Sequence, residues 1–267
     1  MIASAASFAV MAASAKMLPE LPALEKVFFR SLISVLLTAW ALRRAHVSWK
    51  PHRPVMLFMR ALFGFGGLYC YFETIARIPL GSAVTLYNTT PLFAAVIGAA
   101  LLGERFRRIQ IFSLFLGVLG IALIKGFSVE VTWVGVGFGL CTAVFSAFAY
   151  SLVRVLARTE HPLVIVMVFP IVSLPLAWAL GANDFLMPSD EAWIWLLLLG
   201  LGTQGGQICL THGLRHHTAT RATQIGFIGV VFAMFLGVPL GDGVPGWAQL
   251  LGASVVFLSL SLGRNKA

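Results

Sequence analysis

Residues 67–83 read GLYCYFETIARIPLGSA and place one carboxylate, Glu73, among glycine, aromatic and aliphatic residues. The stretch joins two apolar runs, 54–76 and 80–102, and each is long enough for a transmembrane helix of about 20 residues. The runs predict a pair of membrane helices. Because a carboxylate is costly in lipid, Glu73 needs a partner or a function within them.

The composition of the whole chain agrees with a membrane location. Of the 267 residues, 59% are hydrophobic and only 11% are charged. Soluble domains are about 45–50% apolar and about 25% charged. The sequence therefore predicts an all-α polytopic membrane protein and leaves no room for a separate soluble domain.

Apolar runs between charged residues, prolines and glycines predict ten transmembrane helices. The candidate spans are 1–17, 25–42, 54–76, 80–102, 108–125, 132–155, 162–180, 191–213, 219–240 and 246–263. The first run lacks the basic segment that begins a signal peptide, so we interpret it as the first span.

The distribution of Lys and Arg predicts the orientation, because these residues accumulate in cytoplasmic loops. One set of alternate loops holds Arg43, Arg44, Lys50, Arg53, Arg105, Arg107, Arg108, Arg154, Arg158, Arg215, Arg221, Arg264 and Lys266. The opposite loops hold Lys16, Lys26, Arg77 and Lys125, together with the acidic residues Asp184, Asp190 and Glu191. We expect an integral protein of the bacterial inner (cell) membrane with both termini in the cytoplasm. Because the basic residues are spread over five loops, the net charge of +9 does not indicate nucleic-acid binding.

No pattern indicates a catalytic site, a metal or a cofactor. Cys70, Cys141 and Cys209 each lie inside a candidate span without a C-x-x-C or Cys/His spacing. His216 and His217 are adjacent and would point about 100° apart on a helix, which is unsuitable for chelation. Glycine-rich runs such as GLGTQGG follow no strand and are typical of closely packed membrane helices.

An internal repeat divides the chain into two halves of five helices, 1–125 and 132–263. An offset of 138 aligns Gly64 with Gly202, Gly67 with Gly205, Arg77 with Arg215, Thr85 with Thr223, Ala95 with Ala233, Leu102 with Leu240, Gly103 with Gly241 and Glu104 with Asp242. Because five is odd, the second half enters the membrane from the opposite side. Inverted repeats of this kind are typical of transporters that work by alternating access.

Three segments resemble the EamA-type branch of the drug/metabolite transporter superfamily. They are EKVFFRS at 25–31, YFE at 71–73 and ARIPLGSAVTLYNTTPLFAAVIGAALLGER at 76–105. The resemblance is strongest over 54–125, and it implies ten helices from a duplicated five-helix unit. It also implies a central cavity lined mainly by 54–76, 80–102, 191–213 and 219–240, with contributions from 1–17 and 132–155. Glu73 departs from the family, in which this position is more often aromatic or small.

Polar residues on two repeat-related helices are the first candidates for a substrate or proton site. Gly66, Tyr69, Glu73 and Arg77 share one helix face, and the offset relates them to Gln204, Gln207, Thr211 and Arg215. Since lipid cannot solvate these groups, we expect both faces to point into the protein. Glu73 is interpreted as a site for a proton or for the amine of a substrate, and the alternative is a structural pair with Arg77 or Arg30. Anchoring is the favoured role for Arg30, with substrate contact as its alternative.

The sequence YNTTP inside 80–102 predicts an interrupted helix. Pro91 cannot donate to the carbonyl of Tyr87, so the helix should bend there and expose polar backbone beside Thr85, Tyr87 and Asn88. The alternative is that Thr89 and Thr90 satisfy a kink that only serves packing. On 132–155, Ser146 and Tyr150 are i, i+4 neighbours that are suited to lining a cavity.

These patterns favour a secondary transporter over an enzyme. The hypothesis is an exporter of small polar or amphipathic metabolites such as amino acids or related amines. Its expected partners are the lipid bilayer, the substrate and protons as a candidate coupling ion, with the chain a monomer or homodimer. The alternatives are a passive channel or scaffold and, less favoured, an intramembrane lipid-modifying enzyme, which would need a cluster of acidic or His residues.

Overall fold

The computed structural model describes residues 2–90, 92, 93, 97, 112, 115–117, 119, 120, 123, 131–216, 229 and 232–262. Within these residues the chain is helical and contains no strand. The elements are α1 (Ile2–Lys16), α2 (Ala23–Arg44), α3 (Pro54–Arg77), α4 (Leu80–Tyr87), α7 (Trp133–Leu156), α8 (Pro162–Gly181), the 3₁₀ helix η1 (Ala182–Asp184), α9 (Asp190–His216), the π-helical turn η2 (Val238–Asp242) and α11 (Trp247–Leu262).

Four helical segments are long and apolar enough to cross a membrane: Pro54–Arg77, Trp133–Leu156, Pro162–Asp184 and Asp190–Gly213. Shorter apolar helices occur at Ile2–Lys16, Phe232–Asp242 and Trp247–Ser259. The candidate span 108–125 lies mostly outside the described residues, as does the first part of 219–240. The count of ten spans therefore stays a prediction.

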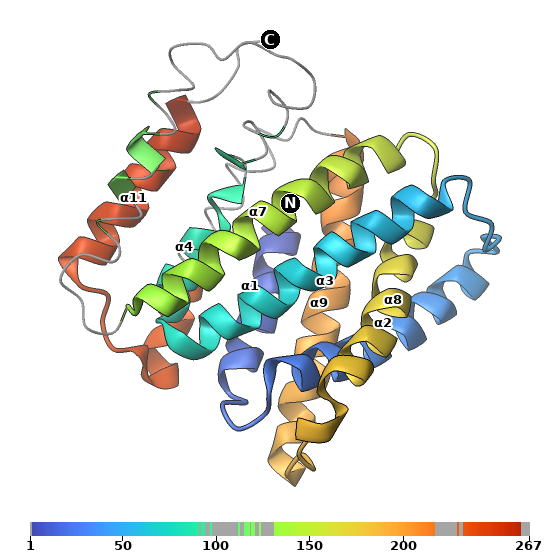
Figure 1. Ribbon diagram of the computed structural model, residues 1–267, viewed down its shortest axis with the longest axis horizontal. Coiled ribbons are helices and arrows are strands. Elements are labelled where there is room, and N and C mark those ends of the chain that lie inside the picture. The colour runs from blue at the N-terminus through green and yellow to red at the C-terminus, as the bar shows by residue number, and fades with distance from the viewer. Residues whose placement is uncertain are drawn as a thin grey trace.

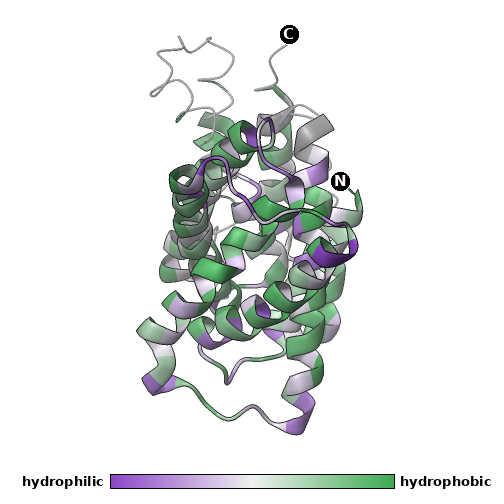
Figure 2. Ribbon diagram, turned by 90° about the vertical axis from the view of Figure 1, so that its right-hand side faces the viewer, coloured by the Kyte–Doolittle hydropathy of each residue, from purple (hydrophilic) through white to green (hydrophobic). Residues whose placement is uncertain are grey.

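Local sequence signals explain where several helices begin. Pro54 and Pro162 occupy the first turns of α3 and α8, where the missing N–H of proline costs nothing. The Thr132 hydroxyl accepts a hydrogen bond from the Gly135 amide at 3.1 Å and caps α7. Hydrophobic residues predominate along the helices and polar residues gather mostly at their ends (Figure 2). Exposed side chains such as Leu36, Trp178 and Phe235 suit contact with lipid.

The helices pack in pairs that join distant parts of the chain (Figure 1). α3 packs along α7, α1 along α9, and α2 along α8. In addition, α2 contacts α9 and α3 contacts α8. The helices α2 and α8 therefore lie between α3 and α9 in the packing, and α2 also contacts α3 while α8 also contacts α9.

Connections gather at two opposite ends of the helices. At the end where α3 begins, the buried Glu160 carboxylate accepts hydrogen bonds from the backbone amides of His52 and Arg53, each at 2.7 Å. At the end where α3 finishes, Asp242 forms an ion pair with Lys16 at 2.5 Å and accepts from the Leu80 amide at 2.7 Å. We call these the Glu160 end and the Asp242 end. Alternate connections thus lie at opposite ends, as a chain that crosses a membrane repeatedly requires.

Candidate substrate-binding site

Two arginines are buried where α2, α3 and α8 meet. Arg30 on α2 is 1% exposed and Arg60 on α3 is 2% exposed. Their guanidinium carbons lie 4.7 Å and 4.6 Å from the centroid of the Phe169 ring on α8. An aromatic ring attracts a cation weakly, and two cations share this one.

Polar side chains of α9 and α2 extend from Arg60, because Gln207 contacts Arg60 and Gln204, one turn away, contacts Thr38; we call the whole group the Arg30–Arg60 cluster. It consists of Arg30, Arg60, Phe169, Thr38, Gln204 and Gln207. Arg60 Nη2 donates to Gln207 Oε1 at 3.2 Å, and Gln204 Nε2 donates to Thr38 Oγ1 at 2.7 Å. Thr38 in turn donates to the Ser34 carbonyl at 2.7 Å. Gln204 and Gln207 were candidates from the sequence, and the structure places both here.

The cluster keeps unused hydrogen-bonding groups. Arg30 Nε, Arg60 Nε and Arg60 Nη1 are buried donors without a protein partner, and Gln204 Oε1 is a buried acceptor without one. Leaving a buried polar atom unpaired costs about 1–3 kcal/mol, and more for a charged group. This concentration of unused donors is unusual in a packed interior and is suited to a ligand.

The described carboxylates that form ion pairs do so elsewhere. Glu73 pairs with Arg77, Glu160 with His52 and Asp242 with Lys16, so none of the ion pairs among the described residues includes Arg30 or Arg60. Glu25 Oε2 instead accepts from the Leu186 amide at 3.0 Å. The cluster therefore carries an excess of positive charge within the described residues.

A pair of tyrosines joins α4 to α7. The hydroxyls of Tyr87 at the end of α4 and Tyr150 on α7 are hydrogen-bonded to each other. The Tyr71 ring of α3 lies 5.4 Å from that of Tyr87. Two further sequence candidates, Tyr87 and Tyr150, are thus brought together across 63 residues of chain.

Glu73 lies away from the cluster, in the last turn of α3 rather than deep within the span. Its carboxylate pairs with Arg77, which also donates to the Glu73 carbonyl at 2.9 Å. The structural pairing set out as an alternative is therefore present, with Arg77 and not Arg30 as the partner. The Arg77 guanidinium also lies 5.0 Å from the Phe138 ring of α7, and Tyr69 contacts the same ring.

The predicted polar faces of α3 and α9 do not both point to the Arg30–Arg60 cluster. Arg60 and Tyr69 are nine residues apart, which at about 100° per residue places them on opposite faces of α3. The face with Tyr69 and Glu73 packs toward α7, so α3 contributes Arg60 to the centre instead. On α9, Gln204 and Gln207 contact the centre. Thr211 donates to the Gln207 carbonyl at 2.8 Å, and the side chain of Arg215 lies outside the described residues.

The predicted interruption of the helix after Leu80 occurs before Pro91. α4 ends at Tyr87, and Asn88 and Thr89 form a turn. Thr85 Oγ1 donates to the Gly81 carbonyl at 2.7 Å and Asn88 Nδ2 to the Val84 carbonyl at 2.8 Å. The hydroxyls of Thr89 and Thr90 donate to the carbonyls of Leu86 and Tyr87. These side chains satisfy their own helix, which favours the packing interpretation of the stretch. Pro91 itself lies outside the described residues.

Sequence reasoning missed Arg60, Phe169 and Thr38. Arg60 had a usable signal, because it is an ionisable residue six positions inside the apolar run that starts at Pro54. Phe169 and Thr38 had none, because an aromatic or a threonine in a membrane helix is ordinary. Their role depends on what they contact.

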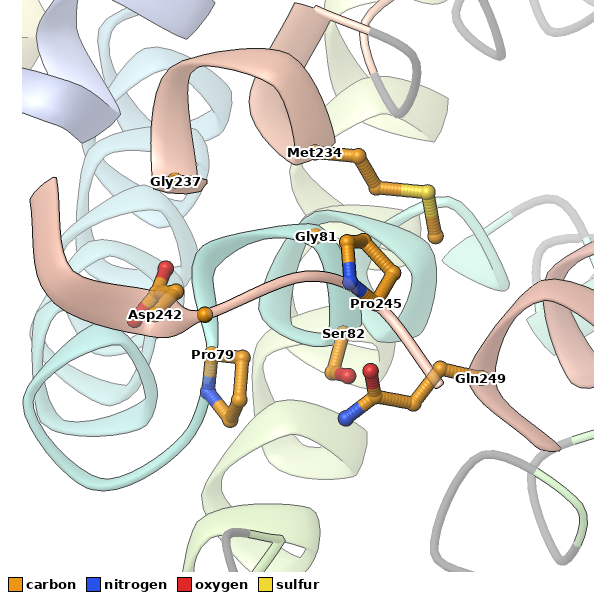
Figure 3. A pocket seen from close by; sticks show the side chains of 9 residues that line it. Pro79, Gly81, Ser82, Met234, Gly237, Asp242, Pro245 and Gln249 are labelled. Atoms are coloured by element: carbon orange, nitrogen blue, oxygen red, sulfur yellow. The ribbon is translucent and has the colours of Figure 1, made fainter. Parts of the chain in front are cut away.

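A small pocket lies at the Asp242 end (Figure 3). Ser82 of α4, Asp242 and Gln249 of α11 are among its polar lining residues. Arg60 and Arg77 are 17 residues apart on α3, or about 25 Å along the helix axis, so this pocket is distinct from the cluster. Its Asp242 is already paired with Lys16, which indicates a contact between helix ends rather than a charged binding site.

Comparison with known proteins gives the family. The model of the EamA-like transporter family matches residues 1–126 and again residues 133–263. The chain belongs to the EamA-like transporter family. It is therefore a membrane transporter of the drug/metabolite type, as the sequence resemblance implied.

The chain is similar to several transporters along most of its length. It is 35% identical to the pseudopaline exporter CntI of Pseudomonas aeruginosa, over 92% of this chain and 88% of the relative. It is 25% identical to an uncharacterized transporter of Helicobacter pylori, over 94% and 89% of the two chains. A crystal structure with 19% sequence identity has the same fold, with a TM-score of 0.68 over 98% of this chain and 96% of the other.

Proposed function

We propose that this protein is a secondary transporter that exports small polar or amphipathic metabolites, such as amino acids or related amines. The observation that carries the proposal is the Arg30–Arg60 cluster, which buries two cations in a chain whose helices are mostly apolar. Ionisable residues at such a position are expensive and mark substrate pathways in membrane proteins. Similarity to an exporter supports the outward direction.

The pairing of helices supports alternating access between two inverted halves. When α1, α2 and α3 are exchanged with α7, α8 and α9, the α3–α7 contact becomes the α9–α1 contact and the α2–α9 contact becomes α8–α3. The α2–α8 contact becomes itself. Two halves that are related by such an exchange can open the same centre to either side of the membrane at similar free energy.

Individual contacts follow the same exchange. A Cβ added at Gly67 of α3 would lie 3.3 Å from the Ser146 hydroxyl of α7. A Cβ added at Gly205 of α9 would lie 3.1 Å from the Ser7 hydroxyl of α1. Gly67 and Gly205 are aligned by the repeat offset of 138 in the sequence. The proposal places the two halves at 1–125 and 132–263, in the bacterial inner membrane with cytoplasmic termini.

The test is transport by the purified chain in lipid vesicles. Vesicles are loaded with a labelled panel of amino acids, amines and neutral controls, and efflux is measured with and without a proton gradient. We expect saturable efflux that is accelerated when unlabelled substrate is supplied on the opposite side, because a carrier returns faster when it is loaded. Arg60→Gln should abolish efflux, whereas Arg44→Gln, which changes an exposed arginine stacked on Trp40, should not.

Flux that never saturates and is not accelerated from the opposite side would contradict the proposal and indicate a passive channel. A dependence on the proton gradient would identify protons as the coupling ion.

A further inference from the structure

We infer that the Arg30–Arg60 cluster is an anion site that binds the carboxylate groups of the transported molecule, and that a molecule with two carboxylates fits it best. The inference deepens the proposed function and depends on it in one respect, which is that the bound molecule is also transported.

The cluster has an unbalanced positive charge among the described residues. Two guanidinium groups are almost completely removed from solvent, and no described carboxylate pairs with either one. A buried cation without a counter-ion is strongly unfavourable, so a site that keeps two of them gains most from an anion. A ligand that carries the missing negative charge would correct the balance only while it is bound.

Both guanidinium groups lie beside one aromatic ring. Each guanidinium carbon lies less than 5 Å from the centroid of the same Phe169 ring, so the two charges are within reach of one small molecule. Arg60 is held on one side by Gln207, while its Nε and Nη1 and the Nε of Arg30 remain free to donate. Arginine donors match the oxygens of carboxylates and form stronger hydrogen bonds with them than neutral donors do.

The remaining polar group of the cluster suggests what the ligand carries besides carboxylates. Gln204 Oε1 is a buried acceptor without a partner, and Gln204 lies one turn of α9 before Gln207, the residue that binds Arg60. An acceptor one helical turn from the Gln207–Arg60 pair is complementary to an N–H group of a ligand whose carboxylate binds Arg60. The preferred class is therefore an amino or imino acid with two acidic groups.

The test measures binding at equilibrium, without any gradient, to the full chain purified in lipid nanodiscs. The probes are iminodiacetate, which has one secondary amine and two carboxylates, its monoamide and its diamide. Inorganic phosphate is included because guanidinium groups also bind phosphate oxygens. Each probe is titrated to about 10 mM, ten times a weak dissociation constant of about 1 mM. The readout is the thermal unfolding midpoint.

We expect iminodiacetate to raise the midpoint by a few degrees, the monoamide to raise it less, and the diamide to leave it unchanged. Arg60→Gln and Arg30→Gln should remove the shift, and Arg60→Lys should retain part of it because the charge remains while the planar donor group is lost. Arg44→Gln is the matched control and should respond as the wild type does. Gln204→Leu should weaken the binding of iminodiacetate more than the binding of succinate, a further probe that has two carboxylates and no N–H group.

An equal shift with the diamide, a shift that survives Arg60→Gln, or no shift with iminodiacetate would each overturn the inference. A response to phosphate that exceeds the response to iminodiacetate would overturn the assignment to carboxylates. A failure of the proposed function can be distinguished from a failure of this binding site. Export of only those amines that lack a carboxylate would keep the proposed function and reject this site, whereas iminodiacetate binding without any efflux would keep the site and reject the proposed function.

Discussion

Burial of the charged Arg60 side chain costs free energy, and packing of the helices alone does not require a charge at this position. Its side chain is buried, it is near a second arginine, and it makes one hydrogen bond to Gln207. Glu73, the charged residue that attracts attention in the sequence, has a neighbouring partner and is partly solvated near a helix end. Removal of either charge is therefore expected to cost the protein little stability, but for different reasons.

We expect Arg60→Met to leave the free energy of unfolding unchanged or to raise it, by up to about 4 kcal/mol. Methionine fills a similar volume and removes a buried charge that has no counter-ion, and such replacements are often neutral or stabilising. The measurement is thermal unfolding in detergent beside efflux from vesicles, in which the variant should be inactive. A loss of about 3–5 kcal/mol, as for a broken buried ion pair, would instead assign Arg60 a structural role.

Glu73→Gln should change the free energy of unfolding by less than about 1 kcal/mol, because partly exposed i, i+4 pairs contribute little. The substitution also separates the two roles considered for Glu73. If the carboxylate carries a proton or binds an amine, efflux should be lost while the unfolding midpoint stays near that of the wild type. Wild-type efflux with and without a proton gradient would leave only the pairing with Arg77.

Close contact between α1 and α9 depends on the absence of a side chain at Gly202. A Cβ there would lie 2.8 Å from the Ser7 carbonyl oxygen and 2.9 Å from the Met11 amide nitrogen, and both atoms belong to the backbone of α1. Neither can move without shifting the helix. Small residues commonly permit this approach between membrane helices.

We therefore expect Gly202→Ala to lower the free energy of unfolding by about 1–3 kcal/mol, as overpacking does. Gly137→Ala is the matched control on α7, where an added Cβ meets nothing within 4 Å. It should be neutral or slightly stabilising, since alanine favours helix by up to about 1 kcal/mol over glycine. Equal unfolding midpoints for the two variants would show that the α1–α9 contact is not tight.

The Asp242 carboxylate joins three elements at one end of the bundle. It pairs with Lys16 at the end of α1 and accepts from the first amide of α4, while Lys16 also donates to the Ile78 carbonyl at 3.3 Å. Asp242→Asn should lower the free energy of unfolding by about 1.5–3 kcal/mol, the range for hydrogen bonds to charged groups. The exposed Asp184→Asn of η1 serves as the control. Strictly additive effects of Asp242→Asn and Lys16→Met would mean that the two side chains do not interact.

The orientation in the membrane is a property of the whole molecule. The Lys and Arg count predicts that residues 43–53 and the C-terminus are cytoplasmic and that 182–190 is external. Single thiols are introduced at the exposed positions Lys50 and Asn183 after the natural Cys70, Cys141 and Cys209 have been replaced. An impermeant reagent added outside intact cells should label position 183 and leave position 50 unlabelled. The reverse pattern would overturn the predicted orientation.

Much of the architecture could be predicted from the sequence because it depends on local properties. Hydropathy located α3, α7, α8 and α9 to within a few residues, since lipid imposes the same length and apolarity on every spanning helix. Within the candidate span 80–102, α4 ends at Tyr87, residues 88 and 89 form a turn, and the residues described at 90, 92, 93 and 97 are helical again, so the end of this span stays a prediction. Gln204 and Gln207 were identified as polar residues in an apolar helix, which is again a local feature.

By itself, the sequence determined that this is a helical membrane protein of the EamA-like transporter type and which of its residues are too polar for lipid. Only the tertiary structure decided which of those residues meet. Arg30, Arg60, Gln207 and Phe169 come from four different helices, and their contact depends on how each helix is rotated about its axis. That rotation is set by close packing between helices such as α1 and α9, which lie far apart in the chain. Hydropathy shows which charges are unfavourable in lipid, whereas the packing of the helices determines which residues surround those charges.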